Sequence, residues 1–389
     1  MAPQKEVPVS FLVSHEWSLV VFMGVISAIA LTNLVAMRRL GRHPVLRESP
    51  AVSVLVPARD EERNIVTCVE SLLRQDYPQF EVIVLDDDSH DGTGRLLQAI
   101  EARSQGRLRV IRGAPVPPGW LGKHWACHQL AGEAQGKLLL FTDADTVHHP
   151  SALQDAVAAL EAEGAGALSV LPRQVVGSWG ETLVIPILSW TLHTFVPFVL
   201  PRRTPTAVGQ FMLFRRDVYA AVGGHKAVRA EVLDDLALAH NVHRAGLGWA
   251  FLDGSRRVTT RMYHGWRETA RGLAKNLFPV FHYNIPLFLF VWTWLLWLAW
   301  QPLVVLGLRL ANNALPEEIL APAAVTVGLS LLTWALAAVR FRLPLVQVPL
   351  YPVTVLLVTG IAFRSLLWHL RQRGTWKGRG IHVQGDGVA

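Results

Sequence analysis

Two clusters of carboxylates follow apolar segments of the sequence, and their residue types are the best suited to do chemistry. Residues 138–141 are four apolar residues, typical of a buried strand, and Asp143 and Asp145 come directly after them. Residues 82–85 form a second apolar segment, which leads into the acidic stretch 86–93, DDDSHDGT. Because ligands bind at the carboxyl ends of strands in open α/β sheets, we predict that both clusters contribute to one site.

The Asp143-Ala144-Asp145 spacing suits the binding of a divalent cation. Carboxylate oxygens are hard ligands that can share the charge of such an ion with a diphosphate. Alternate side chains of a strand share a face, so we expect one carboxylate to bind the metal directly. We assign that role to Asp145, place Asp143 nearer a nucleotide ribose, and add Lys123 as a nucleotide-binding candidate. An acidic pair in a loop is a weak signal alone, and the interpretation depends on the preceding strand.

A third acidic cluster lies at Asp234 and Asp235, at the start of an apolar-periodic helix expected to reach about residue 243. Acidic residues favour helix N-termini, so helix capping is one explanation and catalysis is another. Gly224, in the Gly-Gly pair before this helix, would let an acceptor approach the backbone closely. Gly209 and Gln210 are expected to line the same wall, with plain turn chemistry as the alternative for both glycine sites.

The elements that must position these residues lie in residues 50–262, where strand and helix patterns alternate. Such alternation favours an α/β domain with a mostly parallel sheet. Strands are expected at residues 52–56, 82–85, 108–111 and 138–141, and helices at residues 61–74, 91–103 and 123–135.

The chain as a whole is more apolar than an ordinary soluble enzyme, and the excess lies at the N-terminus and after residue 285. The 389 residues are 51% hydrophobic and only 17% charged, with a mean hydropathy of +0.29. The net charge is +7, but basic residues gather beside apolar spans, as in the cytoplasmic flanks of membrane helices. A nucleic-acid partner is therefore not expected. The only cysteines, Cys68 and Cys127, make neither a disulfide framework nor a zinc-ligand spacing.

Several segments are predicted to contact a lipid bilayer. After a tail of residues 1–16, residues 17–37 carry no charge and are long enough to span it. Arg38 and Arg39 follow, which predicts an uncleaved anchor in the cell membrane and a cytoplasmic catalytic domain. Residues 183–200 are read as an interfacial segment, with a membrane span as the alternative, and residues 263–284 as an amphipathic interfacial helix. Arg267 and Lys275 in that helix are candidates to contact lipid headgroups or a leaving diphosphate.

Membrane segments are also expected over residues 285–370, making the chain multi-pass. Three apolar stretches lie at about 286–308, 319–339 and 345–368, and the first two are predicted spans. The third contains prolines, and it either crosses, re-enters or lies on the surface. Three crossings would place the basic tail of residues 371–389 outside, against the positive-inside tendency.

In their order along the chain, five segments resemble the family-2 inverting glycosyltransferases, which have the Rossmann-like GT-A fold. They are VPARDEERNI from residue 56, VLDDDSHDGT from 84, GWLGKHWACHQLA from 119, LLLFTDADT from 138 and AVGGHKAVRAEVLDDLALA from 221. The resemblance implies a nucleotide-sugar donor, usually a uridine diphosphate sugar, and a Mg²⁺ or Mn²⁺ ion. It implies that Pro57, Asp60 and Glu61 line the nucleoside, that Asp87 holds the base, that Asp145 binds the metal and that Asp235 is the general base. Asp88 stands where the family usually has glycine, and Asp tolerates the left-handed backbone that a glycine suggests.

Within this family the sequence is most similar to membrane enzymes that glycosylate carotenoids and related terpenoid lipids, including hopanoid-associated ones. GWLGKHWACHQLA, GQFMLFRR, KNLF and TWKGRG carry this similarity. The Gln-x-x-Arg-Trp motif of processive synthases is missing near residues 261–276. We therefore expect inverting transfer of a single sugar to an apolar membrane lipid. The alternatives are a processive polysaccharide synthase and a non-catalytic sugar-nucleotide-binding scaffold.

Overall fold

The structure, a computed structural model, describes residues 9–42, 48–200, 205–312, 315–371, 375–376 and 379–380, and it divides into two compact units. The first, here called the sheet unit, comprises residues 37–175, 200–263 and the chain from residue 367 onward. The second, the helical unit, comprises the chain up to residue 36 together with residues 176–199 and 264–366.

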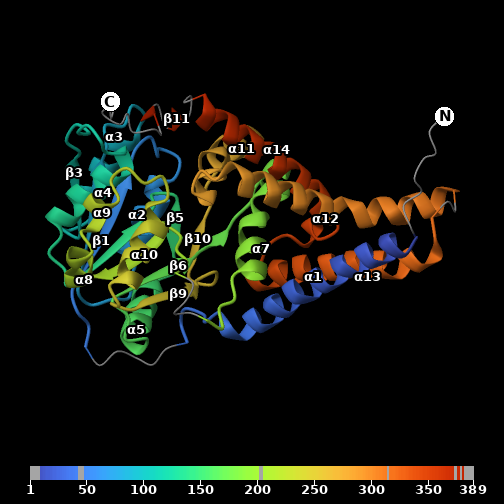
Figure 1. The fold of residues 1–389 in the computed structure, drawn as a ribbon. Coiled ribbons are helices and arrows are strands. Elements are labelled where there is room, and N and C mark those ends of the chain that lie inside the picture. Colours follow the sequence, from blue (N-terminus) through green and yellow to red (C-terminus); the bar gives the residue numbers. More distant parts are fainter. Residues whose placement is uncertain are drawn as a thin grey trace. The chain divides into compact units, whose positions relative to one another are not determined.

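A seven-stranded sheet forms the centre of the sheet unit (Figure 1). Its strands, in spatial order, are β3 (Leu108–Arg112), β2 (Phe80–Asp86), β1 (Val52–Ala58), β4 (Leu138–Thr142), β8 (Phe211–Arg215), β6 (Ala167–Leu171) and β9 (Trp249–Asp253). Only β8 runs antiparallel to its neighbours among these seven strands, which confirms the predicted mostly parallel sheet. A small second sheet joins β5 (Thr146–His148), β10 (Val258–Thr260) and β7 (Arg173–Gln174), and β11 (Thr375–Trp376) pairs with β12 (Arg379–Gly380).

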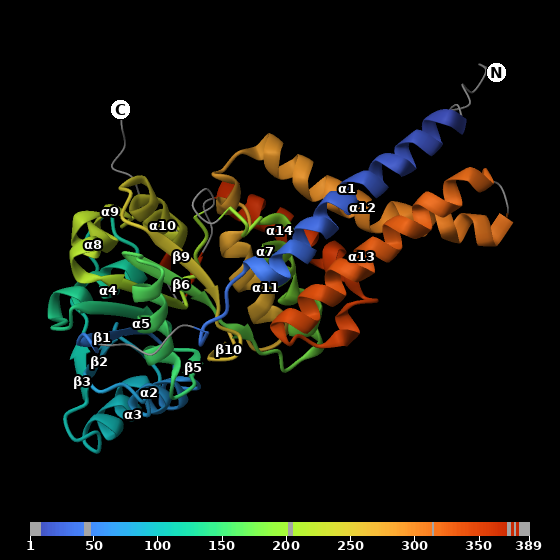
Figure 2. The same cartoon turned by 90° about the horizontal axis from the view of Figure 1, so that it is seen from below.

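Helices cover both faces of the large sheet, because the side chains of each strand alternate between two apolar cores. Val54 and Val56 of β1 enter one core, while Leu55 between them enters the other. The first core is closed by α2 (Ile65–Leu73), α3 (Thr93–Glu101) and α5 (Ala152–Ala162), and the second by α4 (Gly122–Glu133), α8 (Arg216–Ala221) and α10 (Asp234–Arg244), with the short α9 (Gly224–Ala227) beside α4. Figure 2 shows α2 and α3 on one side of β1–β3 and α4 on the other.

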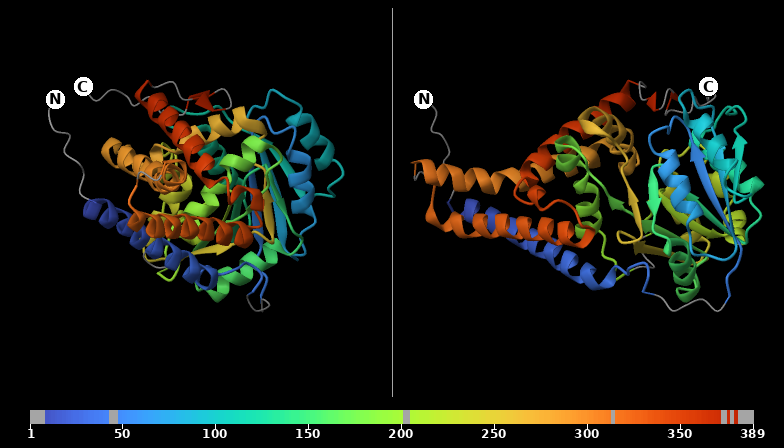
Figure 3. Two further views of the ribbon diagram at one scale, coloured as in Figure 1. Left: turned by 90° about the vertical axis from the view of Figure 1, so that its right-hand side faces the viewer. Right: turned by 180° about the vertical axis from the view of Figure 1, so that it is seen from behind.

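The helical unit contains four helices that are long and apolar enough to cross a membrane. The elements are α1 (Val9–Ala36), α6 (Trp179–Val184), α7 (Pro186–Phe195), α11 (Gly265–Asn276), α12 (Ile285–Asn312), α13 (Leu320–Phe341) and α14 (Tyr351–Leu370). The candidate spans are Leu12–Ala36, Ile285–Ala311, Glu317–Phe341 and Tyr351–Leu370. Helix α13 packs against both α1 and α12 (Figure 3). The third C-terminal stretch is thus a helix of spanning length that begins only at Tyr351, after Pro344 and Pro349.

Two expected segments are shorter in the structure than predicted. Residues 183–200 contain the end of α6 and all of α7, which are not among the candidate spans, so the interfacial placement of this segment stays a prediction. The helix expected over residues 263–284 is α11, which ends at Asn276, because Pro279 then begins a 3₁₀ turn and cannot continue the α-helical hydrogen bonds. Most of the predicted basic tail lies outside the described residues.

Candidate active site

The carboxyl ends of β1, β2 and β4 lie side by side and bring two of the acidic clusters to one edge of the sheet. Ala58 of β1 is in register with Asp86 of β2, and β4 runs parallel to β1 on its other side. The Asp87 amide donates to the Ala58 carbonyl at 2.8 Å, so the second acidic cluster begins where both strands end. This edge is where open α/β sheets bind their ligands.

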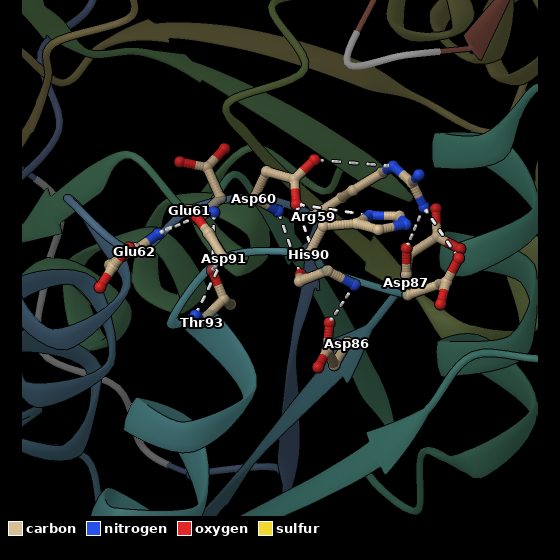
Figure 4. Close-up of polar contacts among 11 residues, drawn as sticks. Arg59, Asp60, Glu61, Glu62, Asp86, Asp87, His90, Asp91 and Thr93 are labelled. Carbon is tan, nitrogen blue, oxygen red and sulfur yellow. Dashed lines mark hydrogen bonds and ion pairs between the residues drawn. The ribbon is translucent and has the colours of Figure 1, made fainter.

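The loop after β1 is held by the loop after β2 through side chain–backbone hydrogen bonds (Figure 4). The Asp60 amide donates to Ser89 Oγ at 3.0 Å, and the Glu61 amide donates to Thr93 Oγ1 at 2.8 Å. The His90 amide in turn donates to Asp60 Oδ1 at 2.7 Å. These bonds join the two loops, and α2 begins at Ile65, not at residue 61 as predicted.

Both loops contain an aspartate with a left-handed backbone. Asp60 has φ of 50° and Asp88 has φ of 57°. Asp88 therefore occupies the conformation expected from the family's glycine, which short polar side chains tolerate. Pro57 lies in β1, one residue before its end at Ala58, on the strand that leads into the same loop.

Arg59 is a site residue that sequence reasoning did not single out. Its guanidinium donates to the Asp87 carbonyl at 2.5 Å and lies 4.0 Å from an Asp60 carboxylate oxygen and 3.8 Å from one of Asp88 (Figure 4). It thus ties the β1 loop to the β2 loop at the predicted nucleoside pocket. Its position in the sequence, between the end of the strand and Asp60, could have suggested a role for Arg59. An arginine at such a position is equally typical of a solvated loop, so the sequence did not distinguish the two.

Lys123 and Asp143 form a close ion pair of 2.5 Å between the ammonium and a carboxylate oxygen. Lys123 lies in the first turn of α4, and Asp143 follows β4. Burial acts to lower the pKa of Lys123, but the carboxylates of Asp143 and Asp234 outweigh it, and the net pKa is raised. Lys123 is therefore a cation at neutral pH, placed within reach of two acidic clusters.

Asp235 is held rigidly at the start of α10. The Gly209 amide donates to its Oδ2 at 2.9 Å, and the Leu236 amide donates to its Oδ1 at 2.8 Å. Burial and the charge of Asp234 raise the pKa of Asp235 to about 6. A carboxylate with this pKa is ionised at neutral pH and is matched to proton transfer near that pH.

Asp234 faces two buried histidines that the sequence pattern did not connect with it. Its Oδ2 lies 3.5 Å from His124 Nε2 and 3.7 Å from His225 Nε2. Burial acts to raise the pKa of Asp234, but His124, Lys123 and His225 lower it overall, so Asp234 stays ionised beside Asp235. No group of three or more His, Cys, Asp or Glu with metal-binding geometry occurs in the part of the chain that the structure describes, so His124 and Cys127 there form no preassembled metal cage.

The charged groups from different segments converge around α4. Burial raises the pKa of the Cys127 thiol, Lys123 opposes this effect, and the charges of Asp234, Asp143 and Asp87 add to it. Carboxylates that follow β2, follow β4 and begin α10 therefore all lie within electrostatic reach of one α4 side chain. Asp145 and Glu61 similarly act on the other buried thiol, that of Cys68.

Gly209 lies between the two charged groups expected to flank the reaction. A Cβ atom at this position would be 3.5 Å from Lys123 Nζ and 3.7 Å from Asp235 Oδ2. Gln210, next to it, has its side-chain oxygen 3.3 Å from the amide nitrogen of Gln174. Gly224 has a different role, since its Cβ would lie 2.5 Å from the Tyr219 ring, which favours the turn-chemistry explanation there.

The remaining two predicted residues belong to the other unit. Arg267 and Lys275 both lie on α11 of the helical unit, whereas all the other predicted site residues lie in the sheet unit. Their part in binding headgroups or diphosphate therefore stays a prediction.

The carboxylates at the end of β4 suit a hard divalent cation, although the described residues do not form a complete set of protein ligands around one. Mg²⁺ binds in proteins through one or two carboxylates together with substrate phosphates, and an all-protein cage is not needed. Asp145 offers such a carboxylate, and the neighbouring Asp143 is already compensated by Lys123. The donor set therefore suits a cation that enters with a nucleotide diphosphate.

Comparisons with known proteins agree with this architecture. Residues 53–223 match the model of glycosyl transferase family 2. A curated relative, the 4,4'-diaponeurosporenoate glycosyltransferase of Staphylococcus aureus (strain USA300), is 28% identical over 233 residues, which cover 58% of this chain and 60% of the relative. The chain thus matches about 60% of the length of this curated relative.

The fold of a solved glycosyltransferase extends over most of the chain. The mannosyltransferase PcManGT from Pyrobaculum calidifontis, solved in complex with GDP-Man and Mn²⁺, superposes with a TM-score of 0.52 at 20% identity. The match covers 93% of this chain and 98% of that chain, which supports the GT-A fold. Residues 53–223 thus match the glycosyl transferase family 2 model, the fold is that of a GT-A glycosyltransferase, and the sequence resembles that of a carotenoid glycosyltransferase.

Proposed function

We propose that this protein is a membrane glycosyltransferase that transfers one sugar from a nucleotide-diphosphate sugar to an apolar lipid, with inversion at the anomeric carbon. A uridine diphosphate sugar is the first choice of donor, and a carotenoid or related terpenoid is the first choice of acceptor. The observation that carries this proposal is the position of Gly209 between Lys123, which pairs with Asp143, and Asp235. Gly209 is thus adjacent both to the predicted nucleotide-binding residue Lys123 and to the predicted base Asp235.

Asp235 is the proposed general base. It accepts the proton of the acceptor hydroxyl while the acceptor oxygen bonds to the anomeric carbon and the bond from that carbon to the diphosphate oxygen breaks. The hydrogen bonds from Gly209 and Leu236 fix the orientation of its carboxylate. A positioned base of this kind contributes roughly 10²–10⁴-fold to the rate.

The donor side is assigned to the loops after β1, β2 and β4. Pro57, Asp60, Glu61 and Asp87 would line the nucleoside, and Asp143 and Lys123 would hold the ribose and diphosphate region. Asp145 would hold Mg²⁺ or Mn²⁺, which neutralises the charge of a leaving diphosphate as a Lewis acid. The structural neighbour that contains GDP-Man and Mn²⁺ supports this class of donor and metal.

The apolar acceptor and the membrane location rest on two further observations. Four helices have the length and composition of membrane spans. The curated relative is a glycosyltransferase for 4,4'-diaponeurosporenoate. Arg38 and Arg39, directly after α1, favour a cytoplasmic position for the sheet unit in a multi-pass protein.

A transfer assay tests the proposal. The full chain, purified in detergent, is given labelled UDP-glucose or GDP-mannose together with membrane lipids that contain carotenoids. We expect a labelled lipid that carries one sugar, its loss with EDTA or Asp145→Asn, and its recovery when Mn²⁺ is returned after EDTA. Glu231→Gln, which changes an exposed carboxylate near α10, is the matched control and keeps activity.

Three other results would each contradict the proposal in a recognisable way. A ladder of long saccharide products would identify a processive synthase. Nucleotide binding without turnover, unaffected by Asp235→Asn, would identify a scaffold. No labelled lipid with any nucleotide sugar would remove the lipid-transfer function altogether.

A further inference from the structure

A buried cluster of two threonines and a histidine lies directly behind the Asp143-Ala144-Asp145 turn. Thr142 Oγ1 and Thr146 Oγ1 are 3.1 Å apart, and His148 Nε2 lies 3.2 Å from the first and 2.9 Å from the second. All three residues are buried, and the His148 ring packs against that of Phe211. None of the three was predicted from the sequence to have a role.

Each threonine hydroxyl also reaches a backbone carbonyl of the site. Thr146 Oγ1 donates to the Asp143 carbonyl at 2.7 Å, at the start of the turn that carries Asp145. Thr142 Oγ1 donates to the Gln210 carbonyl at 2.7 Å. Gln210 follows Gly209, whose amide donates to the carboxylate of Asp235.

Counting donors determines the direction of the central hydrogen bonds. A hydroxyl has one proton, and a carbonyl oxygen can only accept, so both threonine protons are used on the two carbonyls. The lone pairs of both hydroxyls then face His148, whose Nε2 must carry a hydrogen and donate it between them. Burial lowers the pKa of His148 to about 3, so the imidazole is neutral and carries one ring hydrogen, which the donor count places on Nε2.

The cluster therefore forms a continuous connection between the two halves of the site. It runs from the Asp143 carbonyl through Thr146, His148 and Thr142 to the Gln210 carbonyl. Gly209 immediately precedes Gln210 in the sequence, and its amide donates to the Asp235 carboxylate. Every member belongs to the sheet unit, and every link except the covalent step from Gln210 to Gly209 is a hydrogen bond.

We infer that Thr142 is a positioning residue that keeps the metal-binding turn and the loop holding the base at a constant separation. This inference rests on the proposed function of Asp145 and Asp235. Thr142 is buried behind the turn, and its proposed action runs through the Gln210 carbonyl on one side and through His148 and Thr146 on the other. The base and the residue that holds the leaving group must stay at a fixed distance from each other, because small displacements of reacting groups lower the reaction rate strongly.

Thr142→Val tests the inference, because valine has nearly the shape of threonine and has no hydroxyl. Thr142→Ser keeps the hydroxyl and is the rescue variant. Thr260→Val is the matched control, since Thr260 is buried beside Thr146 in the β5–β10 pair and its hydroxyl has no hydrogen-bond partner among the described residues. Thr146→Val repeats the test from the other end of the connection if Thr142→Val does not fold.

Amide hydrogen exchange of the full chain in detergent is the first readout, because it needs no substrate. We expect Thr142→Val to speed exchange in residues 143–146 and in residues 208–211 together. Thr142→Ser and Thr260→Val should leave both segments as in the wild type. Faster exchange in only one segment, or an equal effect of Thr260→Val, would overturn the inference.

Steady-state kinetics with the labelled donor is the second readout. We expect Thr142→Val to lower kcat roughly 10- to 100-fold with little change in the donor KM, as for other residues that orient a site from behind. An unchanged kcat would overturn the positioning role even if exchange increased. If the wild type transfers no sugar while both segments still respond to Thr142→Val, the proposed function fails and the structural coupling stands.

Discussion

At the scale of single residues, the site depends on how differently two adjacent carboxylates are surrounded. Asp234 faces His124 and His225, whereas Asp235 accepts hydrogen bonds from the backbone amides of Gly209 and Leu236. Burial and the charge of Asp234 raise the pKa of Asp235, whereas at Asp234 the effect of burial is outweighed by His124, Lys123 and His225 and the pKa is lowered. Neighbouring groups with separated pKa values can take different roles, which supports the proposal that Asp235 is the base.

The effect of Asp235→Asn on turnover identifies the chemical class of the acceptor. A lipid hydroxyl needs a base, so with such an acceptor turnover should fall by about 10²-fold or more. A lipid carboxylate is already ionised at neutral pH and needs none, so turnover to a glycosyl ester would stay near the wild-type value. The name of the relative's acceptor, 4,4'-diaponeurosporenoate, is that of a carboxylate, which makes this comparison informative.

The measurement is the initial rate with each acceptor class supplied separately, a carotenoid alcohol or a carotenoid acid. We expect Asp235→Asn to abolish most transfer to the alcohol and to spare transfer to the acid. Equal losses with both acceptors would show that Asp235 acts in some way other than as a base.

The pH dependence of transfer to a hydroxyl acceptor should follow the ionisation of Asp235. Asp235 works in its ionised form, so the rate rises with pH through its raised pKa of about 6. Asp234→Asn removes a neighbouring negative charge, lowers the pKa of Asp235 and moves this acidic limb to lower pH. Profiles of kcat/KM against pH for the wild type, Asp234→Asn and the control Glu231→Gln test this, and a limb that does not move would exclude Asp235 as its source.

At the scale of elements, side chains from other segments accept hydrogen bonds from backbone amides before or at the start of a helix. Thr93 and Asp91 accept hydrogen bonds from the amides of Glu61 and Glu62 in the turn that precedes α2, which starts at Ile65. In the helical unit, Glu181 of α6 accepts from the Gly265 amide at 2.7 Å at the start of α11. Such contacts cannot be read from helical periodicity, because they join residues that are distant in sequence.

The close crossing of α6 and α11 predicts a large effect of a small substitution. A Cβ at Gly180 would lie 2.9 Å from the Cα of Trp266, a backbone atom that cannot move aside easily. We expect Gly180→Ala to destabilise the protein by about 1–3 kcal/mol, as overpacking does in other cores.

Gly132→Ala is the matched control for this substitution. Gly132 lies in α4 with nothing within 4 Å of its would-be Cβ, so alanine should be neutral or slightly stabilising. The measurement is the melting temperature of each variant in the same detergent. Equal melting temperatures for the two variants would mean that α6 and α11 do not cross as closely as described.

At the scale of the whole molecule, an α/β unit is combined with a helical unit that contains four candidate membrane spans. This division explains the uneven composition, because a sheet covered by helices on both faces needs an ordinary core, whereas membrane spans need about 20 apolar residues each. The spans also account for the many apolar side chains that are exposed in the helical unit, such as Phe290 and Val339.

Thiol labelling in intact cells tests the orientation of the sheet unit. Cys68 and Cys127 are both buried, so Ala162→Cys, at the exposed end of α5, would introduce the one readily accessible thiol among the described residues. We expect a membrane-impermeant maleimide to label this variant only after the cells are made permeable. Labelling of intact cells would place the sheet unit outside the cytoplasm, and the wild type serves as the control for background labelling.

The sequence by itself determined the fold class, the family resemblance and the acidic strand ends, because strand and helix periodicities and strand-end carboxylates are local patterns. It placed Asp143, Asp145 and Asp235 without distances between them. Only the tertiary structure revealed Arg59, the histidines beside Asp234 and the Thr142–His148–Thr146 connection, since partners such as His124 for Asp234 and the Gln210 carbonyl for Thr142 lie far away in the sequence. A buried polar side chain acquires its role from the partners that folding brings to it, and those partners are not encoded in its neighbourhood along the chain.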